Sequence, residues 1–284
     1  MPRERLEAAN GLNMSGVQLA VFASQGSSGL LYSLLGAPLL VLVNAVTYLY
    51  AGFTELFIRM PPRAPAPEDA ARASLHPFHR FRLELGEGFR YLKGERGLLT
   101  LILVYAVLNF LISPVLVTLP FFAEDYLGLG PAWYGYLMAA FGLGAVLGYG
   151  AAGAFPTRGR ARELAVNASL VVQTLLIYAA LYWKAPAAEI GIFLAIGLTG
   201  GIMNVNIGTL IQLAVPRDYM GRVQGLMTTV AAGAMPLGMA LSGVLFDLSG
   251  QDLPLMFLGS ATLSLAAIAA ALAIKDYRRF LASR

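Results

Sequence analysis

Eight long apolar runs, almost free of charged side chains, constrain this chain more than any other feature. A helix needs roughly 20 apolar residues to cross a hydrocarbon layer of about 30 Å, and these runs are that long. Backbone groups without water must pair within their own segment, so the runs are predicted to be helices. The runs are Leu12–Leu35, Pro38–Phe57 (which contains Glu55), Gly97–Ala123, Leu127–Phe155, Leu164–Trp183, Ile190–Pro216, Val223–Phe246 and Leu253–Ile274.

The composition agrees with a membrane protein. Of the 284 residues, 57% are hydrophobic and only 13% are charged, about half the charged share of ordinary soluble domains. The chain has no cysteine and two histidines, and we predict neither a metal site nor a cofactor. The first run lacks a cleavage site and a second run follows at once, so it is not a signal peptide. The predicted fold class is an all-α membrane protein with eight transmembrane helices.

The basic residues gather in alternate loops. If the chain starts in the cytoplasm and crosses eight times, every Lys and Arg except Lys184 falls on the cytoplasmic side. This is the positive-inside pattern, and it predicts a multi-pass membrane protein with both termini cytoplasmic. The basic excess is thereby explained by the lipid bilayer, and nucleic acid is not an expected partner.

A long loop separates the second and third runs. Residues 61–73 are rich in Pro and Ala, and an amphipathic stretch follows in which Phe78, Phe81, Leu85, Phe89 and Leu92 share one helical face. We predict an interfacial helix whose apolar face lies among lipid headgroups. The alternative is a helix packed against other loops of the protein.

The chain repeats itself at long range. "PRERLEAANGL" (Pro2–Leu12) aligns without gaps with "PRDYMGRVQGL" (Pro216–Leu226), and both stretches enter an apolar run from the same side. A parallel repeat of six helices is the arrangement of the two halves of major facilitator transporters. The chain then corresponds to helices five to twelve of a twelve-helix protein, N-terminally truncated relative to it.

This repeat predicts three parts. Residues 1–60 are the last two helices of an N-terminal bundle, residues 61–96 are a cytoplasmic central loop with an amphipathic helix, and residues 97–284 are a C-terminal six-helix bundle. We expect the helical hairpin of residues 1–59 to pack less completely than the bundle, because four of its partner helices are not in this chain.

The residues also resemble a family directly. "PRERLEAANGL", "EGFRYLKGERGLLTLIL", "YGYLMAAFGLGAVLGYGAAG" and "PRDYMGRVQGL" are similar to stretches of bacterial major facilitator exporters of the macrolide-efflux and enterobactin-exporter type. The resemblance implies a protein of the bacterial inner membrane that works by alternating access between two bundles, driven by proton exchange. Two signatures depart from the family: "GAFPTRGRAR" has Thr157 in an acidic position, and Gly26–Gly29 lacks the antiporter proline.

Polar residues inside the runs are candidates for a substrate cavity. Asn204 lies in a stripe of glycines on one helical face, where an amide facing lipid would be unsatisfied. Packing of that stripe against another helix is the alternative, and Asn206 points the other way, toward a neighbouring helix. By resemblance helices seven and ten line the cavity. The predicted cavity residues are Gln18, Gln25, Tyr105, Asn109 and Asn204.

Charged residues at the cytoplasmic helix ends are candidates for a gate. Arginine and acid stand side by side in both copies of the repeat and could latch two bundles together; topogenic charge alone is the alternative. The predicted gate residues are Arg3, Glu4, Arg158, Arg217, Asp218 and Arg222. We expect no acidic residue in the middle of a run: Glu55 lies beside Arg59 at a membrane edge, where an ion pair is favoured over a proton site.

The predicted function is secondary active efflux of small amphipathic molecules of the drug or siderophore kind, with protons as the partner expected from the family. The alternatives are an inactive fragment and a regulatory membrane subunit without transport of its own. An enzyme is not predicted, because no nucleophile–base pair, metal cluster or phosphate-binding loop is present.

Overall fold

The computed structural model describes residues 12, 16, 17, 20, 36, 38–57, 77–130 and 132–283, and only the backbone of residues 77–85, 217, 218, 231 and 232. All regular structure in this part of the chain is helical, which confirms the all-α part of the predicted class. Six helices are long and apolar enough to cross a membrane, and they match the third to eighth predicted runs. They are Arg96–Tyr126, Ala132–Ala154, Arg160–Tyr182, Pro186–Ala214, Tyr219–Leu248 and Leu253–Ala273.

The structure describes the first two predicted runs only in part. Run Leu12–Leu35 lies outside the described residues except at single positions, and residues 38–55 form a helix in a unit separate from the six spans. The count of eight spans is therefore still a prediction.

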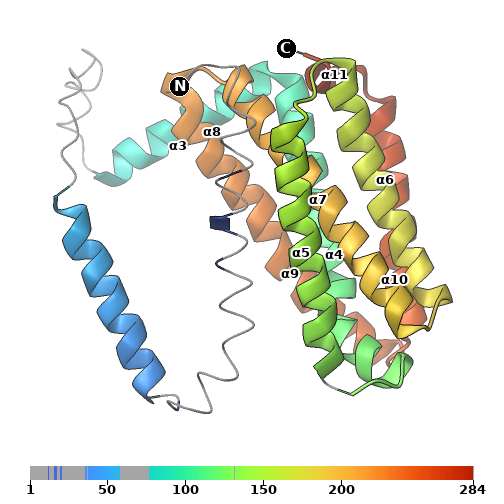
Figure 1. Cartoon of the computed structure of the whole chain (residues 1–284). Coiled ribbons are helices and arrows are strands. Elements are labelled where there is room, and N and C mark those ends of the chain that lie inside the picture. The colour runs from blue at the N-terminus through green and yellow to red at the C-terminus, as the bar shows by residue number, and fades with distance from the viewer. Residues whose placement is uncertain are drawn as a thin grey trace. The chain divides into compact units, whose positions relative to one another are not determined.

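The spans are assembled from the following elements, labelled as in Figure 1: α3 (Pro77–Gly94), α4 (Arg96–Phe121), η2 (Phe122–Tyr126), α5 (Ala132–Ala154), α6 (Arg160–Tyr182), α7 (Pro186–Ala214), α8 (Arg217–Met227), η3 (Thr228–Ala232), α9 (Gly233–Leu248), α10 (Leu253–Ala273) and α11 (Lys275–Leu281). The elements η2 and η3 are single π-helical turns. They continue α4 and join α8 to α9, so each of these two spans contains a local break in the regular hydrogen-bond pattern.

Helix ends follow from local chemistry. Asp252 caps α10, because its Oδ1 accepts a hydrogen bond of 2.9 Å from the backbone N–H of Leu255, and Pro254 stands in the first turn, where no donor is needed. Gly128, Gly159 and Gly250 have positive φ in the connections, a conformation that favours glycine.

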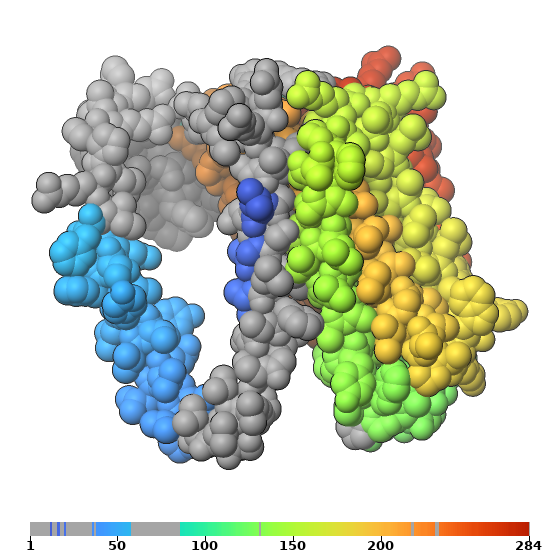
Figure 2. Space-filling view, viewed as in Figure 1, coloured from blue at the N-terminus to red at the C-terminus, as the bar shows by residue number. Residues whose placement is uncertain are grey.

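Each span packs against the next in a continuous series. The helix α5 contacts α7, α7 contacts α6, α6 contacts α10, α10 contacts α4, and α4 contacts α9. Figure 2 shows the face on which α5, α6 and the N-terminal part of α7 lie side by side. Two buried apolar clusters fill the interior, one near α8 and α11 that includes Leu98 and Ile211, and one near η2 that includes Phe122 and Phe257.

Glycines allow a close approach between α5 and α7. A Cβ atom added at Gly144 or Gly148 would overlap backbone atoms of α7, and one added at Gly197 or Gly201 would overlap backbone atoms of α5. Small residues on both helices thus bring the two backbones into direct contact.

The amphipathic helix α3 is held by protein rather than by lipid over its second half. Glu87 forms a 2.9 Å ion pair with Arg222 of α8, and Tyr91 stacks on Tyr219 at 4.6 Å between ring centroids. Leu92 is buried in the core, whereas Phe89 is 51% exposed. The interfacial interpretation is wrong for Leu92, because α8 supplies an apolar surface that the sequence pattern alone did not reveal.

The short helix α11 anchors the end of the chain through Tyr277. Its hydroxyl donates a 3.1 Å hydrogen bond to Oδ1 of Asn167 in α6. Burial, with a smaller contribution from nearby Glu163, raises the pKa of Tyr277 from 10.0 to about 12. An unfolded tyrosine loses its proton near pH 10, so the stability that this shift provides is complete below pH 10 and is lost as pH rises toward 12.

We therefore predict that Tyr277→Phe removes part of the alkaline destabilisation. The wild type should lose more stability than the variant between pH 10 and pH 12, by up to about 2.7 kcal/mol for a shift of about two units. At pH 7 the variant should be less stable by about 1 kcal/mol, since Asn167 loses a donor. Thermal unfolding in detergent at a series of pH values measures both differences in stability. If the stability of the two proteins falls equally between pH 10 and pH 12, the prediction is contradicted.

Candidate functional site

A cavity of about 310 Å³ lies inside the bundle and is lined by residues of all six spans. Most of its wall is apolar, and its polar groups come from five side chains of α4, α6 and α7 and one of α10. The polar lining residues are Tyr105, Asn109, Gln173, Thr174, Asn204 and Ser264. A mainly apolar cavity with a few placed polar groups is the usual form of a small-molecule site.

Three predicted cavity residues meet in this wall. The hydroxyl of Tyr105 donates a 3.2 Å hydrogen bond to Oδ1 of Asn204, which links α4 to α7. Nδ2 of Asn109 donates to the carbonyl oxygen of Tyr105 at 2.8 Å, and Nδ2 of Asn204 donates to that of Gly200 at 2.9 Å. All three side chains are half-buried, so they form a polar edge that a ligand in the cavity would contact.

The glycines of α7 have both roles that the sequence left open, packing against a neighbouring helix and lining the cavity. Gly197 and Gly201 pack against α5, whereas Gly200 has open space where a side chain would be and lines the cavity with Asn204. Asn206 points elsewhere, and its Oδ1 accepts a hydrogen bond from the hydroxyl of Thr157 in the α5–α6 connection. The structure therefore gives this face of α7 both a packing side and a cavity side.

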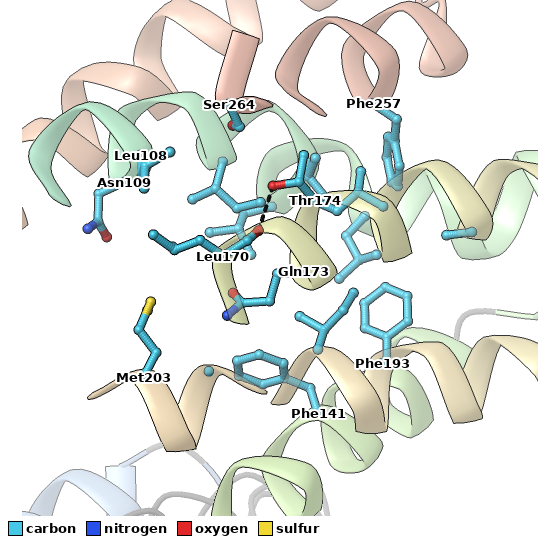
Figure 3. Close-up of a pocket in the computed structure, with 18 of the residues that line it drawn as sticks. Leu108, Asn109, Phe141, Leu170, Gln173, Thr174, Phe193, Met203, Phe257 and Ser264 are labelled. Atoms are coloured by element: carbon cyan, nitrogen blue, oxygen red, sulfur yellow. Dashed lines mark hydrogen bonds between the residues drawn. The ribbon is translucent and has the colours of Figure 1, made fainter. Parts of the chain in front are cut away.

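Sequence reasoning missed the contribution of α6 and α10. Gln173 is the clearest case, because its buried Nε2 has no hydrogen-bond partner among the described residues. Figure 3 shows Gln173, Asn109 and Met203 bordering the same space. Thr174 is satisfied by the carbonyl oxygen of Leu170 at 2.9 Å. Polar residues in the middle of an apolar run were the available signal.

The structure describes the other predicted site residues only in part. Gln18, Gln25, Arg3 and Glu4 lie outside the described residues, and the side chains of Arg217 and Asp218, which begin α8, are not described. Arg158 is exposed in the α5–α6 connection. Arg222 pairs with Glu87 of α3, so its observed partner lies within the same unit of the chain. The gate is still a prediction.

One acidic residue is buried at the end of a span, whereas the sequence-based expectation concerned only acids in the middle of a run. Glu189 lies in the first turn of α7, which begins at Pro186 rather than at Ile190, and its side chain is fully buried. The predicted run begins at Ile190 because the charge of Glu189 ends the apolar pattern, whereas the helix itself begins four residues earlier, at Pro186. Within the described ranges no cluster of three or more potential metal ligands occurs.

Comparison with known proteins gives one family and several relatives. The model of the Major Facilitator Superfamily matches residues 1–239. Macrolide efflux protein A of Streptococcus pyogenes is 24% identical over 256 residues, which cover 89% of this chain and 61% of that protein. Macrolide efflux protein A of Enterococcus faecalis is 24% identical over 84% of this chain and 72% of its own length.

A third relative, the uncharacterized MFS-type transporter YkuC of Bacillus subtilis (strain 168), is 22% identical over 93% of this chain and 62% of its own length. This chain thus spans about three fifths of the length of the first relative. No solved structure gives a significant match.

Proposed function

Because this chain belongs to the Major Facilitator Superfamily, we propose that it takes part in exporting small amphipathic molecules by alternating access, with protons as the counter-ion. Family membership and the apolar helices make it a multi-pass membrane transport protein, as the sequence resemblance implied. We further propose that its helices are eight in number, correspond to helices five to twelve of a twelve-helix transporter, and place both termini in the cytoplasm of a bacterium.

The observation that carries the proposal is the cavity between the spans. Its polar edge of Tyr105, Asn109 and Asn204 faces a wall of leucine, isoleucine, phenylalanine and methionine side chains. A molecule with a large apolar body and a few hydroxyl or carbonyl groups matches both parts. Two relatives are named as macrolide efflux proteins, and a macrolide has this chemistry, so a macrolide is the first substrate to test.

The test is binding of a labelled macrolide to the purified chain, followed by efflux from cells that express it. Asn204→Leu should weaken binding about tenfold, which corresponds to about 1.4 kcal/mol, because it removes a polar contact and leaves the Tyr105 hydroxyl without its acceptor. Thr199→Val is the matched control. Thr199 lies on the same helix, bonds only to carbonyl oxygens of its own helix and does not line the cavity.

Absence of saturable macrolide binding by the wild type would contradict the proposed substrate class. Binding that is equally weak in the Asn204 and Thr199 variants would contradict the assignment of the cavity.

A further inference from the structure

Glu189 is a buried acid that is not among the residues lining the cavity. Its exposed fraction is 0%, and neither carboxyl oxygen has a hydrogen-bond partner among the described residues. An ionised carboxylate buried without a partner is far more costly than a neutral acid. The first turn of a helix favours a negative charge, but this effect is weaker than the cost of burying an unpaired ion. We therefore take Glu189 to be protonated in this conformation.

The position of Glu189 connects it with the cavity. Five residues of α7 line the cavity, and they follow Glu189 at helical spacings of 4, 7, 11, 14 and 15 residues. At about 100° per residue, all five lie within about 60° of its direction on the helix. These residues are Phe193, Ile196, Gly200, Met203 and Asn204. Glu189 thus stands on the cavity face of α7, one turn beyond Phe193.

No basic group neutralises this acid in the described structure. The nearest cation in sequence, Lys184, lies over the ring of Tyr126 at 4.1 Å from Nζ to the centroid. The hydroxyl of Tyr178 is paired with that of Thr262 at 2.7 Å. Apart from these, the titratable groups on the elements around this end of α7 are Tyr134 and Tyr136 on α5, Tyr182 on α6, Glu124 and Asp125 in η2, Asp247 on α9, and Asp252 at the start of α10. None bonds to the Glu189 carboxyl.

We propose that Glu189 is a proton-binding site of the transport cycle, protonated as this end of α7 closes and ionised when the opposite end opens the cavity to water. The carboxylate takes up one proton from the water at this end of α7 as that end closes, and it releases the proton into the cavity when the opposite end opens. One O–H bond forms and later breaks, and the proton crosses the membrane. The coupling of this step to export depends on the proposed function, whereas the neutral state of the buried acid does not.

Infrared difference spectroscopy of the purified whole chain in lipid tests the neutral state. At pH 7 the wild type should show the C=O band of a protonated carboxylic acid, and Glu189→Gln should remove that band. Glu124→Gln is the matched control, because Glu124 lies at the same end of the bundle and is exposed. The proposal is overturned if the band persists in the Glu189 variant, or if the wild type has no such band.

Transport by proteoliposomes tests the coupling. Glu189→Gln should keep macrolide binding within about twofold of the wild type and should keep exchange without a gradient, but it should lose at least about tenfold in uptake driven by a pH gradient. Gradient-driven uptake equal to that of the wild type would overturn the coupling. Failure of the wild type to bind macrolide would instead contradict the proposed function and leave the infrared result to decide the state of Glu189.

Discussion

Gly197→Ala is expected to destabilise the bundle by about 3 kcal/mol, at the upper end of the range for overpacked sites. The new methyl group would overlap the carbonyl oxygen of Phe141, and because that atom belongs to the backbone of α5, no side-chain rotation relieves the overlap. The gain in helix propensity from glycine to alanine, about 1 kcal/mol, is smaller than this cost. Thermal unfolding in detergent, followed by tryptophan fluorescence, measures the loss.

The same helix provides the control for this experiment. Gly200→Ala makes the same chemical change three residues away, where no atom lies within 4 Å of the added methyl group. This variant should be as stable as the wild type or slightly more stable. Equal stability of the two variants would contradict the close contact between α5 and α7.

Gly200→Phe is expected to abolish binding in the cavity, with a loss in affinity of at least about a hundredfold, or about 2.7 kcal/mol. Gly200 lines the cavity and has open space before it, so a benzyl group there would occupy the volume that a ligand needs. The polar edge formed by Tyr105 and Asn204 would be covered as well. Equilibrium binding of a labelled macrolide measures the effect.

Gly200→Ala separates the effect of a large side chain in the cavity from the effect of replacing glycine in the backbone. Gly200→Ala should keep most of the affinity, and the Phe variant should remain folded, because its side chain fills a space that is already present. Undiminished macrolide binding by a folded Gly200→Phe protein would place the substrate site elsewhere in the chain.

The sequence was informative where a residue's role follows from its own helix. Six apolar runs became six spans, and Asn204 could be assigned to the cavity because an amide has few alternatives inside a membrane. Asn206 was separated from it by helical direction alone, and the structure pairs it with Thr157.

Roles that depend on how two helices pack together could not be predicted from the sequence alone. Gly197 and Gly200 look alike in sequence, and only the position of α5 distinguishes the packing glycine from the cavity glycine. The pattern around Leu92 is typical of a lipid-facing residue, but in the structure Leu92 is buried in a cluster that includes Val223 of α8. Glu189 was overlooked because a hydropathy run ends at its first charge, whereas a helix continues for as long as its backbone can pair.

The contact of backbone against backbone between α5 and α7 has a mechanical consequence. Helices whose backbones touch at four glycines cannot slide past each other there without steric overlap, so α5 and α7 should travel as a single rigid body. The neighbouring spans are built differently: α4 contains Pro114 and Pro120 and runs into η2, and α9 contains Pro236 and follows η3. Proline and π turns are where helices bend. A change in cavity volume should therefore come from flexing of α4 and α9 against a stiff α5–α7 wall.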